Sequence, residues 1–154
     1  MRRILLYVLY TLLSTSCSTF SGIPEIIIHA EELMPQNPDS ALFLLGSLNT
    51  GNINSQKIRA KYAVVYSQAL DKNYIDETND SLITIAVKYY KKHGNIKEKF
   101  MSLYYLGRIQ YNAGHYTRAM LSYMEAIPLI EQLDDDYLSG LLFSQISQIY
   151  ANNF

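Results

Sequence analysis

The 154-residue sequence contains little cysteine, glycine and proline and has almost no net charge. Each of these features excludes a class of protein. Its single cysteine excludes an internal disulfide framework and any metal site built from several thiolates. Seven glycines and four prolines are few for a β fold with many turns. The formal net charge of −1 supplies no long-range field that would favour DNA, RNA or an acidic membrane. We therefore expect no nucleic-acid binding by this segment.

Apolar residues make up 49% of the chain, and they recur every three to four positions between short polar joints. This spacing predicts amphipathic helices around one sizeable core. We predict an all-α domain over residues 23–154, with antiparallel helical hairpins over about 23–49, 55–94 and 96–133. An unpaired C-terminal helix over 136–154 would begin an incomplete fourth unit. Because such a helix cannot bury its apolar face alone, we expect further repeats or domains after Phe154, or another chain, to cover it.

The clearest pattern spans residues 100–128, where two helical segments flank an Asn-Ala-Gly turn signal at residues 112–114. The smallest residues on the two apolar faces are Gly107, Ala119 and Ala126. Their size lets two helix axes approach near the short end of the ~8–10 Å packing range. We predict that this close contact organises the fold.

The same stretch resembles the tetratricopeptide repeat family, which places Leu-Gly in a first helix, Gly-x-Tyr at the turn, and Ala, Tyr and Ala in a second helix. The matching positions are Leu103, Leu106, Gly107, Gly114, Tyr116, Ala119, Tyr123 and Ala126. The resemblance implies a right-handed α-solenoid of about three hairpins plus one helix. It also implies a scaffold that binds proteins or peptides rather than an enzyme.

In tetratricopeptide arrays the first helix of each hairpin lines a concave groove, so the resemblance implies a set of ligand-facing residues. They are Tyr104, Arg108, Tyr111 and Asn112 in the central unit, Lys57, Val64, Ser67 and Gln68 in the preceding unit, and Ser144, Gln148 and Asn152 in the last helix. Arginine can pair with a ligand carboxylate, asparagine can hold an extended backbone, and tyrosine supplies flat contact area. The alternative is a solvated concave face without a tight ligand.

The first 17 residues have the order of an export signal: two arginines, an apolar run over 4–13, and small residues before Cys17. The run is shorter than the ~20 residues of a membrane-spanning helix. The segment resembles a bacterial lipoprotein signal, which implies lipid attachment at Cys17, with residues 18–22 as a short tether. Two alternatives stay open, namely ordinary signal cleavage near Ser16 and retention as an uncleaved anchor.

The remaining candidates for chemistry have simpler explanations. His29 and Glu32 lie one helical turn apart, but no further metal ligand accompanies them. The acidic run 134–136 lacks the alternating ligands and central glycine of an EF-hand and suits a helix N-terminus better. Tyrosines 62, 66, 123 and 150 fall on core positions of the family pattern. With no phosphate loop and no nucleophile beside an obvious base, we predict no enzymatic activity, no cofactor and no metal site.

These observations predict an exported scaffold of the bacterial cell envelope, periplasmic or associated with the outer membrane. The segment Asp71–Ile83, following an export signal and degenerate repeats, resembles the N-terminal sensor portions of bacterial membrane-bound regulators. That resemblance implies a signalling or transcription-regulatory role. The alternative is a structural or assembly lipoprotein that acts as a spacer or platform. Both roles imply a protein or peptide in the groove and membrane attachment through lipidated Cys17.

Overall fold

A computed structural model of the chain describes residues 22–153, and all regular structure in that range is helical. The elements are α2 (Ile23–Leu33), α3 (Pro38–Gly46), the short 3₁₀ turn η1 (Thr50–Asn52), α4 (Gln56–Lys72), α5 (Ser81–His93), α6 (Ile96–Asn112), α7 (Tyr116–Leu133) and α8 (Asp136–Asn153). The prediction of an all-α chain is confirmed. The export signal, Cys17, most of the tether and Phe154 lie outside the described residues.

Side-chain caps explain where three of the helices begin. At α6 the Asn95 side chain accepts a hydrogen bond from the backbone N–H of Glu98, and the Glu98 carboxylate accepts one from the N–H of Asn95, both at 2.9 Å. This reciprocal capping box satisfies two N–H groups that a helix otherwise leaves unpaired. Ser55 caps α4 by accepting from the N–H of Ile58, and α8 begins with a cap from the predicted acidic run.

Helices α3 and α5 begin without a hydrogen bond to the side chain of the N-cap residue. Asn37 precedes α3 and Asp80 precedes α5, but neither side chain makes a capping hydrogen bond. At α5 the Asn79 side chain accepts from the N–H of Ser81 at 3.0 Å, so the residue before Asp80 takes the role. Pro38 lies in the first turn of α3, where its missing N–H costs nothing.

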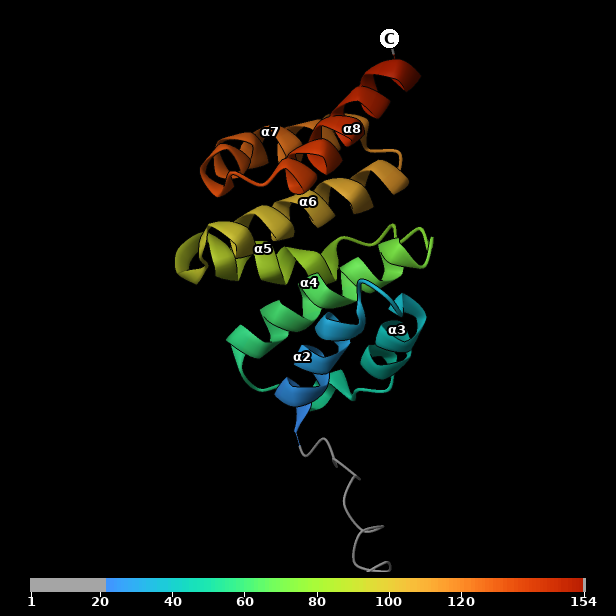
Figure 1. Cartoon of the computed structure of the whole chain (residues 1–154), viewed down its shortest axis with the longest axis vertical. Helices are drawn as coiled ribbons and strands as arrows, with labels where there is room; N and C mark the ends of the chain where they lie inside the picture. Colours follow the sequence, from blue (N-terminus) through green and yellow to red (C-terminus); the bar gives the residue numbers. More distant parts are fainter. Residues whose placement is uncertain (1–21, 154) are drawn as a thin grey trace, which may run out of the picture.

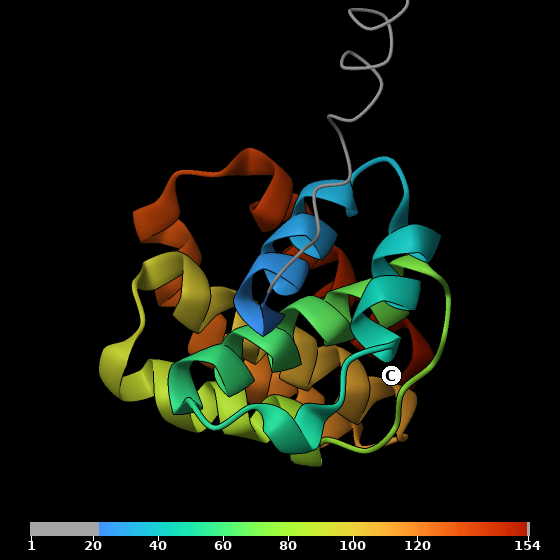
Figure 2. The ribbon, with the colours of Figure 1, turned by 90° about the horizontal axis from the view of Figure 1, so that it is seen from below.

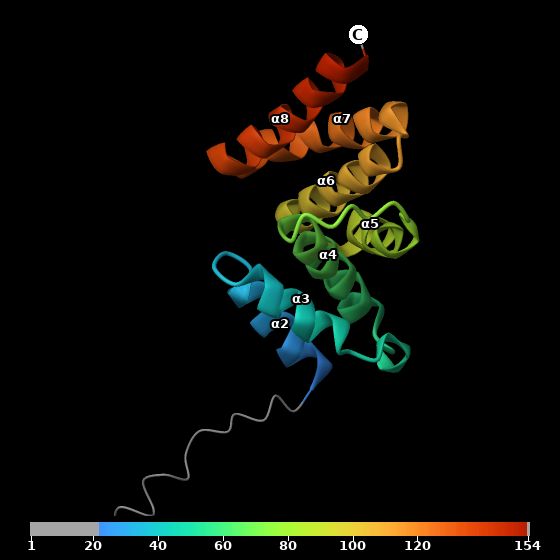
Figure 3. The same cartoon turned by 90° about the vertical axis from the view of Figure 1, so that its right-hand side faces the viewer.

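The helices are stacked in chain order, with α2 and α3 at one end and α7 and α8 at the other (Figure 1). Each α-helix packs against the next one, and the most extensive contact joins α6 to α7. Alternate helices also touch, because α4 contacts both α2 and α6, and α6 contacts α8. A view turned by 90° shows the same succession (Figure 3), and a view from the N-terminal end shows α2 and α3 in front, with α4 and α5 visible beside them (Figure 2).

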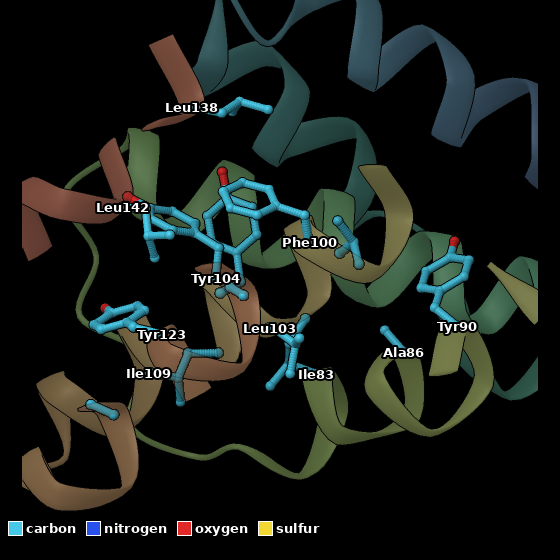
Figure 4. Packing of buried hydrophobic residues seen from close by; sticks show 14 of the residues in the cluster. Ile83, Ala86, Tyr90, Phe100, Leu103, Tyr104, Ile109, Tyr123, Leu138 and Leu142 are labelled. Carbon is cyan, nitrogen blue, oxygen red and sulfur yellow. The ribbon is translucent and has the colours of Figure 1, made fainter. Parts of the chain in front are cut away.

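Buried side chains form two clusters that meet at α4. The first cluster joins α2, α3 and one side of α4, which contributes Tyr62, Val65 and Ala69. The second joins the other side of α4 to α5, α6, α7 and α8, and part of it is drawn in Figure 4. Leu82 of α5 packs against both clusters. Helix α4 therefore holds the two halves of the stack together.

The contact between α6 and α7 depends on small residues. Gly107 is buried, and a Cβ atom added there would overlap the ring of Tyr123. Ala119 and Ala126 are fully buried on the facing helix. The Tyr123 ring lies 6.1 Å from that of Tyr104, centroid to centroid, inside the second cluster (Figure 4). The glycine gives the aromatic ring its space.

Candidate ligand-binding cleft

An open cleft of about 640 Å³ lies along the side of the stack. Its lining comes from the end of α2, one face of α4, the end of α5, and the beginnings of α6 and α8. The lining residues are Glu31, Met34, Pro35, Lys61, Val64, Gln68, Lys72, Tyr90, Asn95, Lys97, Glu98, Met101, Asp135, Tyr137 and Leu138. Segments more than 100 residues apart in the chain therefore share one surface.

Helix α4 contributes four of the lining residues, Lys61, Val64, Gln68 and Lys72. Their spacings of three and four residues place them in a row along one face of the helix. Of the residues predicted to face a ligand, the cleft contains Val64 and Gln68. This spacing of three and four residues along α4 is the sequence signal from which Lys61 and Lys72 could also have been predicted to line the cleft.

The floor of the cleft is apolar and well packed. Met34, Tyr90 and Leu138 are 2%, 2% and 6% exposed, and each belongs to a core cluster. Burial raises the pKa of the Tyr90 hydroxyl well above its ordinary value of 10, with a smaller contribution from Glu98. Tyr90 is therefore neutral at physiological pH, and the floor offers dispersion contacts rather than charge.

The rim of the cleft carries charges of both signs, and its carboxylates already have partners. Glu31 pairs with Lys61. Glu98 belongs to the capping box of α6, and Asp135 accepts from the N–H of Leu138 at 3.0 Å. Lys72 lies 3.3 Å from the Tyr137 hydroxyl, and its ammonium lies 6.0 Å from the ring centroid. An incoming segment would thus meet an apolar floor between fixed polar groups.

The other residues predicted to face a ligand lie elsewhere. Tyr104 and Ser67 are buried, at 3% and 5% exposure, because they face neighbouring helices. Tyr111 and Asn152 join α6 to α8 through a 2.8 Å hydrogen bond from the amide to the phenol oxygen. The remaining predicted positions, which do not line the cleft, are Lys57, Ser144 and Gln148, all exposed, and the half-buried Asn112.

Arg108 was also predicted to face a ligand, and in the structure its side chain binds within the fold. Its Nε and Nη2 atoms both lie 2.8 Å from Oδ1 of Asp71, and Nη1 donates to Oε1 of Gln145 at 2.6 Å. Burial acts to lower the pKa of Arg108, but the charge and hydrogen bond of Asp71 outweigh it and the net shift is upward. This arginine ties α4, α6 and α8 together, and the side of its guanidinium formed by Nε and Nη2 is taken by Asp71.

The residues of the repeat pattern occupy several environments. Gly107, Leu103 and the two alanines are buried, and Leu106 is half-buried. Gly114 ends α6 with a φ of 75°, a left-handed conformation that glycine adopts without strain. Tyr116 is 38% exposed, with its ring centroid 5.3 Å from that of Tyr111. The pattern therefore combines packing positions with a turn position.

Within residues 22–153 no group of three or more His, Cys, Asp or Glu side chains could hold a metal ion. His29 Nδ1 lies 3.7 Å from Glu32 Oε2, one helical turn away. No α-helix in the described part of the chain has the length and apolar character to cross a bilayer.

Comparison with known proteins found no matching family model, no matching curated protein and no matching solved structure.

Proposed function

We propose that this chain is a non-enzymatic helical-repeat scaffold of the tetratricopeptide kind, wound as a right-handed α-solenoid, which binds an extended segment of a protein or peptide in the cleft. The observation that carries the proposal is the makeup of the cleft, an apolar floor between charged rims. Helices α2, α4, α6 and α8 contribute most of its lining, and α5 contributes Tyr90. First helices of successive hairpins are expected to face one hollow in this way.

The proposed setting is the bacterial cell envelope, where the chain serves as the sensor portion of a signalling or transcription-regulatory protein. Support comes from the composition of the first 17 residues and from the resemblance of the segment Asp71–Ile83. A second role, a structural or assembly lipoprotein, rests on Cys17 alone. Replacing Cys17 with alanine should abolish incorporation of labelled lipid in cells, and retention of the label would refute the lipoprotein assignment.

The binding proposal is tested with a random peptide library displayed on phage and selected against the purified chain. Peptides recovered from the selection should lose at least tenfold in affinity for Met101→Glu, which places a charge beside the apolar floor. The matched control is Met124→Glu on α7, because Met124 is 57% exposed and does not line the cleft. Circular dichroism melts verify that both variants fold.

Three results would contradict the proposal: no enriched peptide, equal affinity of the peptides for both variants, or a greater loss with the control. Because both substitutions turn a methionine into a glutamate, the general effect of added charge is the same in each. The comparison therefore isolates the position of the charge.

A further inference from the structure

The end of helix α6 provides a reference for an unusual position elsewhere in the chain. There the N–H of His115 donates to the carbonyl of Gln110 at 2.8 Å, and the N–H of Gly114 donates to that of Tyr111 at 2.9 Å. These two hydrogen bonds define a Schellman turn, whose left-handed residue is most often glycine. Gly114, with its φ of 75°, fills that position.

Helix α4 ends in the same turn, but a tyrosine occupies the left-handed position. The N–H of Ile75 donates to the carbonyl of Leu70 at 3.0 Å, and the N–H of Tyr74 donates to that of Asp71 at 3.1 Å. Tyr74 has a φ of 57°. A side chain with a Cβ atom strains the backbone in this region, and a bulky one is uncommon there. Glycine at this position would avoid the backbone strain and so stabilise the fold.

The Tyr74 side chain lies in solvent rather than in the core. It is 95% exposed, more than any other large apolar or aromatic residue in the described range. Within residues 22–153 its ring stacks on no other ring, and its hydroxyl makes no hydrogen bond. An aromatic residue that strains its backbone and makes neither a ring contact nor a side-chain hydrogen bond within residues 22–153 is suited to contact with another molecule.

The segment around Tyr74 is held in place rather than free. The Asn73 amide donates to the carbonyls of Pro38 and Ala69, at 2.8 and 2.7 Å. Further along, the Glu77 carboxylate accepts from the N–H groups of the two residues that follow it, at 2.8 and 2.7 Å. A ring presented on a fixed backbone loses little entropy when it binds, which is what an interface anchor requires.

The charge around Tyr74 indicates the chemistry of the partner. Residues 71–80 contain four acidic side chains and one basic side chain. Asp71 is neutralised by Arg108, whereas Asp76 and Glu77 follow the tyrosine without an ion-pair partner in the described part of the chain. Complementary charge steers association and selects the partner.

We propose that residues 73–77 form a docking surface, separate from the cleft, in which Tyr74 is the anchor for a protein partner that offers an apolar recess bordered by lysine or arginine. None of these five residues lines the cleft, so the proposal is independent of the function assigned to it. Its test uses photocrosslinking in cells that produce the full chain.

In that experiment p-benzoylphenylalanine replaces Tyr74, and in a matched control it replaces Leu121, which is 62% exposed on α7. A discrete protein adduct is expected from position 74 and not from position 121, and the crosslinked peptide should contain lysine or arginine. The adduct should decrease at least fivefold with the pair Asp76→Asn and Glu77→Gln. Those changes remove two charges while each side chain keeps an oxygen acceptor.

Four outcomes would overturn the proposal: no adduct at position 74, an equal adduct at position 121, an adduct with a second copy of this chain, or an adduct unaffected by the charge-removing pair. Tyr74→Gly provides the folding control. It removes the ring and the backbone strain together, so its melting temperature should equal or exceed that of the parent chain. The positive result is complete when excess parent protein competes away the adduct formed from position 74 and excess Tyr74→Gly does not.

Discussion

Replacing Gly107 with alanine tests the contact between α6 and α7 most directly. An added Cβ would lie 2.6 and 2.7 Å from Cδ1 and Cζ of Tyr123 and would overlap Cε1 as well, whereas ordinary contacts are 3.4–4 Å. The ring cannot swing into solvent because Tyr123 is 0% exposed. Overpacking of this kind typically costs about 1–3 kcal/mol of folding free energy.

The same substitution also replaces a glycine inside a helix with alanine. That replacement alone stabilises the helix by roughly 0.8–1 kcal/mol. Gly140→Ala in α8 supplies that gain without the clash, since nothing lies within 4 Å of the added atom. The difference between the two variants therefore isolates the overpacking cost. For a domain of this size we expect Gly107→Ala to melt roughly 3–12 °C below Gly140→Ala.

Thermal unfolding followed by circular dichroism measures that difference. Equal melting temperatures for the two alanine variants would refute the assignment of Gly107 to the helix contact. A double-mutant cycle adds a further check. In a Tyr123→Leu background the cost of Gly107→Ala should shrink, because the ring that it meets is gone. An unchanged cost would mean that the strain arises elsewhere.

Three more predictions concern stability. Arg108→Ala should lower the free energy of unfolding by about 1–3 kcal/mol in urea titrations, because Asp71 loses a charged hydrogen-bond partner; no change would contradict the tie between helices. Tyr123→Phe should leave the melting temperature equal or raise it, since the buried hydroxyl has no hydrogen-bond partner among residues 22–153; a clear loss would reveal a partner. Burial raises the pKa of Tyr62 and Tyr104 to about 12, against about 10 when unfolded. The folded state therefore holds these protons more tightly, so the stability that the two tyrosines contribute should be constant below about pH 10 and fall between about pH 10 and 12 in melts across that range; a flat profile between about pH 10 and 12 would contradict the burial of these hydroxyls.

The helices could be predicted from the sequence because their signals are local. The Asn-Ala-Gly turn separates α6 from α7 where the pattern places it, and α5 ends before Gly94 as its basic last turn indicates. Caps were less predictable. Both Asn79 and Asp80 can cap a helix, and only the path of the preceding segment decides that Asn79 does so.

The positions of single side chains around the cleft could not be predicted, since they depend on contacts between distant segments. Arg108 finds Asp71, which is 37 positions away in the chain. Lys72 reaches Tyr137 over 65 positions. Tyr104, predicted to face a ligand, lies in the core beside the rings of Phe100 and Tyr123. Contacts between such distant side chains do not change the local spacing of apolar residues, so this spacing cannot predict them.

The division of the interior at α4 has a mechanical consequence. Met34 on the floor of the cleft belongs to one cluster, while Tyr90 and Leu138 belong to the other, so the cleft crosses the seam between them. A molecule seated there would brace both sides and resist bending of the N-terminal helices against the rest. A molecule in the cleft would then make the stack of helices stiffer, without any helix having to change its structure.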